Sequence, residues 1–168
     1  MDDVERHRFA PNGPIPNNPA LPLLVYRGVL AGGEGAAAAC EKLFQAHGWS
    51  NGWRNGVYDH HHFHSTAHEA LGVVKGEVRV RFGGEGGETV AVRAGDVVVI
   101  PAGVAHRNEG ASGDLLVIGA YAGGRDYDMC KGGEPDVVRR IADLPTPEAD
   151  PVYGARGPLL RAWGVISP

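Results

Sequence analysis

The sequence predicts an all-β fold, either a sandwich or a closed barrel of short strands. The chain has 168 residues with 26 glycines and 12 prolines, and these residues separate short apolar runs. Short strands about eight to twelve residues apart, joined by glycine-rich turns, are typical of both architectures. The length suffices for a full hydrophobic core, and no internal repeat is visible, so residues 1–168 are predicted to form a single domain.

The N-terminal part, residues 1–52, is predicted to hold an arm, one strand and the one clear helix. Residues 1–20 are rich in proline and asparagine, which indicates an irregular arm. Residues 21–30 are apolar and favour a first strand. Residues 34–47 contain an alanine run and end before Gly48, so a helix is expected there.

The central part, about residues 53–122, is predicted to consist of strands. In Glu77–Phe82 apolar residues alternate with arginine, so the apolar side chains should face the core. Glycines within 83–87 indicate a hairpin loop. The predicted strands are 57–64, 67–75, 77–82, 89–93, 96–100 and 114–121.

Residues 123–168 are predicted to form an irregular tail that packs on the barrel or on a neighbouring molecule. This segment begins with a glycine-rich stretch, and 137–144 is expected to form one or two helical turns. Two placements are open for four residues at the junction between the last predicted strand and this segment, which either cover the mouth of the barrel or pack within the tail: Tyr121, Arg125, Tyr127 and Asp128.

A group of histidines is the most informative feature of the chain. Five of the eight histidines fall within the nine residues 60–68. Alternate residues of a strand point to one side, so His60, His62 and His64 can share an interior face. A turn after these residues lets Glu69 return opposite them.

A second motif runs from Gly95 to His106. Gly95 permits a tight turn before a short buried strand, and Pro101 and Gly103 end that strand and turn His106 inward. Three neutral imidazoles and one carboxylate form a ligand set for a divalent transition metal. The predicted metal ligands are His62, His64, Glu69 and His106.

Three further histidines have other predicted places. His60 is a candidate acid–base or substrate-binding residue at the pocket rim, the alternative being a half-solvated histidine at the barrel mouth. His61 should face outward. His68 should point away from Glu69 on a regular strand, but a β-bulge would exchange the two and make His68 the ligand.

The two motifs together resemble those of the cupin superfamily over about residues 53–122. The matching positions are Gly56, His62, His64, Glu69 and Gly76, and then Gly95, Pro101, Gly103 and His106. The second motif departs at its end, where Gly110 stands in place of the family's asparagine. That position belongs to a turn and not to the predicted ligand set.

The flanking segments 15–24 and 51–58 further resemble a branch of small single-domain bacterial cupins known as YjlB. The resemblance implies a cupin-type jelly-roll β-barrel and one divalent metal ion, which would be Fe, Mn, Ni or Zn. It implies no substrate. It also implies that the arm and the tail build a homodimer across sheet edges.

The composition argues against several classes of function. The net charge of −4 and the lack of a basic stripe argue against a nucleic-acid partner. No apolar run is long enough for a membrane span, and the charged N-terminus does not resemble a signal peptide. A cytoplasmic protein with Cys40 and Cys130 as free thiols is therefore expected.

The predicted function is a metal-dependent enzyme that acts on a small polar or anionic metabolite as an oxygenase, isomerase or decarboxylase. A divalent ion with one carboxylate has a net charge of about +1, which favours an anionic ligand. A six-coordinate metal would keep two open positions for substrate. The alternative is a non-catalytic module that binds a small molecule or a metal, since the sequence shows no second acid–base pair.

Overall fold

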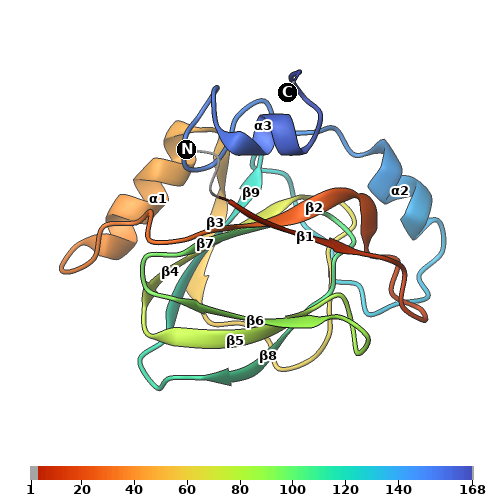
Figure 1. Ribbon diagram of the computed structural model, residues 1–168, viewed down its shortest axis with the longest axis horizontal. Helices are drawn as coiled ribbons and strands as arrows, with labels where there is room; N and C mark the ends of the chain where they lie inside the picture. The colour runs from red at the N-terminus through yellow and green to blue at the C-terminus, as the bar shows by residue number, and fades with distance from the viewer. Residues whose placement is uncertain (1–3, 168) are drawn as a thin grey trace.

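A computed structural model describes residues 4–167 and shows two antiparallel sheets that pack face to face (Figure 1). The strands are β1 (Glu5–Phe9), β2 (Asn18–Tyr26), β3 (Trp49–Asn55), β4 (Glu69–Lys75), β5 (Glu77–Phe82), β6 (Glu88–Arg93), β7 (Val97–Ile100), β8 (His106–Ala111) and β9 (Leu116–Ala122). The helices are α1 (Ala36–Ala46), α2 (Val137–Asp143) and α3 (Pro158–Ala162). The larger sheet has six strands in the order β1-β2-β7-β4-β9-β3, and the smaller has three in the order β6-β5-β8. The predicted all-β jelly-roll barrel with a helix on its N-terminal side is confirmed.

The space between the sheets is filled by aliphatic and aromatic side chains. In β5 the alternation has the predicted effect: Val78, Val80 and Phe82 are buried, while Arg79 is exposed and Arg81 is half-buried. Because successive residues of a strand point to opposite sides, β5 gives one face to the core and the other to water.

Helices α1 and α3 cover the face of the six-stranded sheet that points away from the smaller sheet (Figure 1). Gly72 of β4 makes room for α1, since a Cβ there would lie 2.5 Å from Cys40 Sγ and 3.2 Å from the Phe44 ring. Beyond α3, the Trp163 indole N–H donates to the Pro22 carbonyl oxygen at 2.9 Å. The tail therefore packs on the chain's own sheet.

Asp150 anchors the tail to β2. Its carboxylate is fully buried and accepts a hydrogen bond from the Tyr26 hydroxyl at 2.6 Å. It also accepts the backbone N–H groups of Val152, Tyr153 and Leu159 at 2.8, 3.0 and 3.1 Å. One buried carboxylate thus satisfies four donors from two distant parts of the chain.

Most predicted elements agree with the structure. The predicted helix 34–47 contains α1, and 137–144 contains α2. The glycine-rich loop joins β5 to β6, and six predicted strands correspond to β2, β4, β5, β6, β7 and β9. Cys40 and Cys130 are both buried and free, as predicted.

The predictions for the more polar segments are wrong. Residues 4–20 are not an irregular arm, because they contain β1 and the start of β2, which pair antiparallel; the first three residues of the predicted arm lie outside the described residues. Residues 57–64 are not a regular strand and form only isolated bridges, to β8 and to the tail. Strands β3 and β8 and helix α3 lie where the sequence predicts no such element. β1, β3 and β8 are edge strands of mainly polar sequence, so they lack the apolar alternation that reveals β5 and the edge strand β6.

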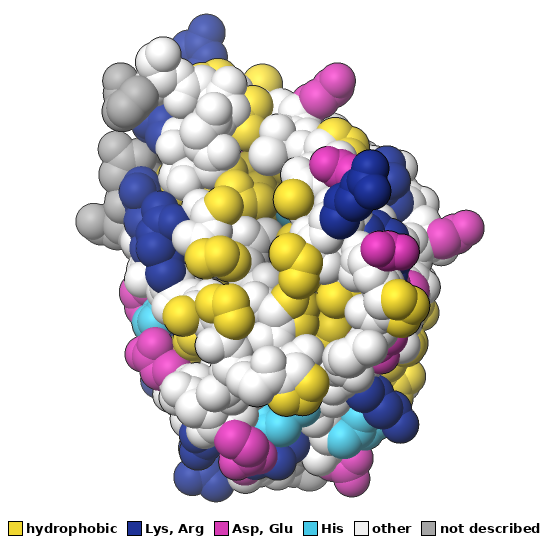
Figure 2. All heavy atoms as spheres, turned by 90° about the vertical axis from the view of Figure 1, so that its right-hand side faces the viewer, with side chains coloured by type: hydrophobic (Ala, Val, Ile, Leu, Met, Phe, Trp, Pro, Cys, Tyr) yellow, Lys and Arg dark blue, Asp and Glu magenta, His cyan; other side chains and the backbone are white. Residues whose placement is uncertain are grey.

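The surface around α2 is mixed in character. Figure 2 shows this end of the molecule, with hydrophobic side chains near the middle and acidic and basic side chains around them. Among residues 4–167, no helix has the length and the apolar composition that crossing a membrane requires.

Candidate metal centre

The segment between β3 and β4 brings two predicted ligands to β8. The His106 N–H donates to the His62 carbonyl oxygen at 2.9 Å, and the His62 N–H donates back at 3.3 Å. This pairing sets the two imidazoles side by side, with ring centroids 4.1 Å apart. His64 follows on the same side because alternate residues of an extended chain share a face. Phe63 between them is buried in a separate apolar cluster.

The turn after β7 directs His106 inward. Gly103 has a φ of +97° and donates its N–H to the His64 carbonyl oxygen at 2.8 Å. A side chain here would collide with the Asn17 carbonyl oxygen, and the positive φ would strain it. The turn therefore needs glycine, which agrees with the role predicted for Gly103.

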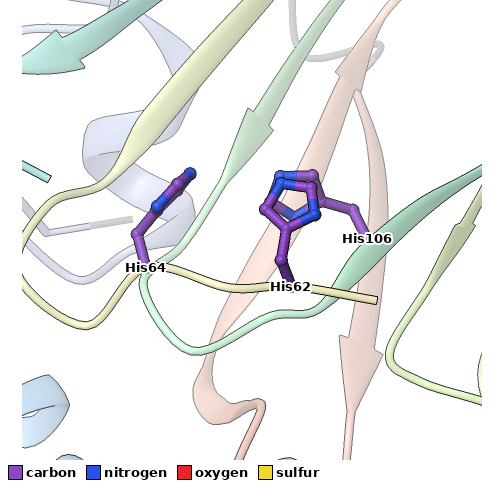
Figure 3. Close-up of side chains that lie close together, drawn as sticks. All are labelled: His62, His64 and His106. Carbon is purple, nitrogen blue, oxygen red and sulfur yellow. The ribbon is translucent and has the colours of Figure 1, made fainter. Parts of the chain in front are cut away.

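The four predicted ligands meet in one place. His62, His64 and His106 each offer a nitrogen atom, and these atoms lie within 4.8 Å of one another (Figure 3). The Oε1 atom of Glu69 lies 3.4 Å from Nε2 of His64 and 3.3 Å from Nε2 of His106. Two ligands of one ion at about 2.0–2.2 Å, with ordinary bond angles, are about 3.0–3.5 Å apart. The spacing of Glu69 from both imidazoles suits a shared cation.

Backbone carbonyls fix the tautomer of all three imidazoles. The Nδ1–H group of His62 donates to the His60 carbonyl at 3.1 Å, and that of His64 donates to the Asp128 carbonyl at 2.6 Å. The Nδ1–H group of His106 donates to the Val104 carbonyl at 3.2 Å. A carbonyl oxygen can only accept, so in each neutral imidazole Nδ1 carries the proton and Nε2 is left with a lone pair.

Tyr121 holds the carboxylate of Glu69. The two residues are directly opposite each other in the β4–β9 ladder, and the Tyr121 hydroxyl donates to Glu69 Oε2 at 2.8 Å. The Trp53 indole N–H donates to the same hydroxyl at 2.9 Å. Glu69 Oε1 is buried and has no hydrogen-bond donor among the residues described. One oxygen is thus anchored, and the other is directed at the histidines.

Burial and charge set the protonation of the group. Burial and the nearby His106 lower the pKa of His62 to about 3, so this imidazole is neutral at physiological pH. Burial acts in the same direction on His64, but the Glu69 carboxylate outweighs it and raises the pKa of His64. Burial raises the pKa of Glu69, yet His64 and His106 outweigh that effect and lower it. Glu69 is therefore ionised.

This donor set fits a divalent transition metal. Three nitrogen lone pairs and a carboxylate oxygen face one another, with no proton donor between them in the described part of the chain. Buried acceptors that meet in this way are unfavourable unless a proton or a cation lies between them. Imidazole and carboxylate are ligands for Fe, Mn, Ni and Zn alike.

The remaining histidines of the group lie outside this cluster. The side chain of His60 is 46% exposed and lies near Asp59. Its backbone carbonyl accepts from His62, and its ring centroid lies 5.6 Å from that of His62. His61 Nε2 lies 2.9 Å from a Glu85 carboxylate oxygen at the surface. His68 is buried on the side away from the metal ligands, where its Nδ1 accepts the Ala102 N–H at 2.9 Å.

Asp128 supports the site from the tail. Besides the carbonyl that accepts from His64, its carboxylate accepts the Ser65 N–H at 2.6 Å and the Ser65 hydroxyl. Burial raises the pKa of Asp128, but the Ser65 hydrogen bonds outweigh it and lower the pKa to about 2. Arg125 lies outside, with its Nε–H donating to the Thr66 carbonyl at 3.1 Å. No motif or spacing in the sequence predicts that Asp128 contacts the turn next to His64.

A cavity of about 230 Å³ opens above the cluster. All four predicted ligands and Tyr121 contribute to its wall. The rest of the wall is mainly aromatic and apolar, and includes Trp53, Val57, Tyr58, Leu71, Tyr127 and Met129. Of the four residues with two open placements, Tyr121 and Tyr127 line the cavity, while Arg125 and Asp128 do not.

Comparison with known proteins agrees with the fold. Residues 54–118 match the family model of the cupin domain. A bacterial protein is 41% identical over 165 residues, which cover 96% of this chain and 97% of that protein. The chain belongs to the cupin family. The relative is the uncharacterized protein YjlB of Bacillus subtilis (strain 168).

Solved structures share part of the fold. The WlaRB TDP-quinovose 3,4-ketoisomerase from Campylobacter jejuni is 12% identical, with a TM-score of 0.42 over 52% of this chain and 73% of its own. Acireductone dioxygenase from Bacillus anthracis, with a cadmium ion in its active center, is also 12% identical. Its TM-score is 0.40 over 59% of this chain and 77% of its own.

Proposed function

We propose that this protein is an enzyme that binds one divalent transition metal through His62, His64, Glu69 and His106. Its substrate would be a small molecule whose polar or anionic oxygen atoms reach the metal. The observation that carries the proposal is the unpartnered Oε1 of Glu69, which is buried 3.3–3.4 Å from two imidazole nitrogens. Oxygenase, isomerase and decarboxylase chemistry are all compatible with this ligand set.

When bound, the metal would act as a Lewis acid, and the ion together with the Glu69 carboxylate would carry a net charge of about +1. The protein's own groups hold the ligands in place. The three backbone carbonyls keep the imidazole lone pairs directed at one point, and Tyr121 keeps Glu69 from turning away. Burial and the charge of Glu69 raise the pKa of Tyr121, so its hydroxyl stays protonated and continues to donate.

His60 is the proposed proton-handling residue. Its ring does not line the cavity but lies beside two residues that do, with its centroid 5.3 Å from that of Tyr58 and 5.6 Å from that of His62. It would therefore act on a substrate atom at the cavity mouth rather than on one next to the metal ligands.

The second candidate function is a non-catalytic cupin module that binds a small molecule or a metal. One observation favours it. Apart from the four predicted ligands, the described residues that line the cavity include no Asp, Glu, His, Lys or Cys. Such a wall can enclose a ligand, but it offers few groups that transfer protons near neutral pH.

The first experiment is elemental analysis of protein purified without a metal-affinity tag. We expect about one divalent ion per chain. Alanine at His62, His64, Glu69 or His106 should each reduce the metal content strongly. His61→Ala is the matched control and should not, because His61 pairs with Glu85 at the surface. Iron or manganese would favour an oxygenase, whereas zinc or no metal would favour the binding module.

The second experiment measures binding of oxalate to the metal-loaded and the metal-stripped protein. Oxalate presents two oxygen atoms, so it should bind the loaded form alone and change the visible spectrum of a Co²⁺-loaded sample. Equal binding to both forms would show recognition without the metal, and the module would then be the better function.

A further inference from the structure

The rim of the cavity holds an unusual share of the exposed hydrophobic side chains. Seven large hydrophobic residues are exposed in the described chain, and three of them line this cavity. These are Tyr58, Tyr127 and Met129, which are 56, 40 and 46% exposed. Exposed apolar side chains that gather at one concave site mark a surface that binds apolar groups.

Two of the exposed rings flank the predicted ligands. The Tyr58 ring meets the His62 ring edge to face, with centroids 5.1 Å apart. The Tyr127 ring stacks on Tyr121 at 4.3 Å and meets His64 edge to face at 5.3 Å. A molecule bound to the metal would therefore extend out of the cavity between the Tyr58 and Tyr127 rings, each of which contacts a different predicted metal ligand.

The charges of the wall point to the same kind of ligand. No Lys or Arg is among the described residues that line the cavity, and Glu69 provides its one carboxylate. A phosphate or a second carboxylate would therefore have no basic side chain to pair with away from the metal. Trp53, Val57 and Leu71 add apolar surface deeper in the cavity.

We propose that the substrate of this site has a planar, apolar body, such as a single aromatic ring, that carries two adjacent oxygen atoms. The oxygen atoms would face the metal, and the ring would lie between Tyr58 and Tyr127. Pockets that bind drug-sized ligands have volumes of about 300–1,000 Å³. The cavity of about 230 Å³ fits a smaller molecule with one ring. This inference rests on the proposed function, because the oxygen atoms need a metal to bind.

The test compares two ligands with the same metal-binding head. Acetohydroxamate and benzohydroxamate both present two oxygen atoms, but the first carries a methyl group and the second a phenyl ring. Calorimetric titration into Co²⁺-loaded protein should show benzohydroxamate binding at least about fivefold more tightly, because stacked rings add to the burial of the phenyl group. Neither compound should bind the metal-stripped protein.

Variants at the rim test the role of the rings. Tyr58→Ala and Tyr127→Ala should each weaken benzohydroxamate several-fold and acetohydroxamate much less, while Tyr127→Phe should keep the preference. Tyr153→Ala is the control, because Tyr153 is 42% exposed but lies outside this cavity. Cobalt content and thermal denaturation of each variant show that the site and the fold are intact.

The possible results separate the two proposals. Metal-dependent binding of both compounds with equal affinity would overturn the aromatic substrate class and leave the proposed function in place. A preference that survives both alanine variants would also overturn it. Failure of both compounds to bind loaded protein, or equal binding to stripped protein, would overturn the proposed function and this inference with it.

Discussion

The side chains of His68 and Glu69, adjacent in sequence, point to opposite sides of the sheet. Glu69 faces His64 and His106 in the cavity, with its Oε1 3.4 and 3.3 Å from their Nε2 atoms. His68 accepts the Ala102 N–H at 2.9 Å, and its ring centroid lies 4.8 Å from that of Trp163. Glu69 therefore belongs to the candidate metal centre, and His68 contributes to the packing of the tail.

Substitutions at these neighbours should separate metal binding from stability. Glu69→Ala should lower metal affinity at least about tenfold. His68→Ala should keep the metal but lower the free energy of unfolding by about 2–3 kcal/mol, because it removes a buried ring and leaves the Ala102 N–H unpaired. Metal analysis and denaturant unfolding check both. A His68→Ala protein that folds normally but has lost its metal would contradict the placement.

Tyr121→Phe should weaken metal binding while the fold remains. The variant removes the hydroxyl that donates to Glu69 Oε2 and accepts from Trp53. Loss of a group that orients a metal ligand typically costs about 10–100-fold in metal affinity. Competition with a chromophoric chelator measures the change. Tyr153→Phe, at an exposed position, is the control and should bind metal like the unmodified protein.

Metal affinity should fall as the pH falls. The pKa of His64 is raised by Glu69, so in the metal-free protein His64 takes up a proton more readily than an ordinary histidine. That proton must leave Nε2 before a metal can bind, so affinity should drop by about tenfold per pH unit once His64 is protonated. His62, with its pKa near 3, adds no competition until far lower pH. An affinity that stays constant between about pH 7.5 and 5.5 would contradict this.

Asp150→Ala should destabilise the protein without changing the metal site. It leaves the Tyr26 hydroxyl and three backbone N–H groups without their buried acceptor. We expect a loss of about 3 kcal/mol in the free energy of unfolding. Tyr26→Phe removes one of the four bonds and should cost about 1 kcal/mol. Denaturant titration measures both, and the metal content of the folded fraction should equal that of the unmodified protein.

A homodimer is the expected assembly. The six-stranded sheet ends in β1 and β3, and each edge strand has unpaired backbone groups that a second copy could cover. Light scattering at micromolar concentration should give twice the mass of the chain. A monomer under these conditions, with both ends of the chain intact, would contradict the expectation.

The strands with a clear apolar pattern could be predicted from the sequence, and the polar edge strands β1, β3 and β8 could not. In β5 alternate valines face the core, so hydrophobicity reveals the strand. Strands β1, β3 and β8 read Glu-Arg-His-Arg-Phe, Trp-Ser-Asn-Gly-Trp-Arg-Asn and His-Arg-Asn-Glu-Gly-Ala. Apart from the buried His106, their polar side chains are exposed or half-buried, and their pairing depends on a backbone partner that no local pattern identifies.

The candidate site likewise has features that could be predicted from the sequence and features that could not. The common side of His62 and His64 follows from a two-residue period, which holds even though their segment is extended without being a regular strand. The bond from Tyr121 to Glu69 and the carbonyl of Asp128 behind His64 depend on chain segments 52 and 64 residues away. Contacts at that separation come from the tertiary fold, which spacing alone does not specify.

The bond from His64 to Asp128 also bears on when the centre can form during synthesis. A ribosome makes the chain from its N-terminus, so all four ligands are complete before Asp128 exists. Until the tail returns, the His64 ring lacks the acceptor that fixes its tautomer, and the Ser65 turn lacks the carboxylate that holds it. A nascent chain that ends after β9 therefore carries every ligand but lacks the support that Asp128 gives to His64 and Ser65.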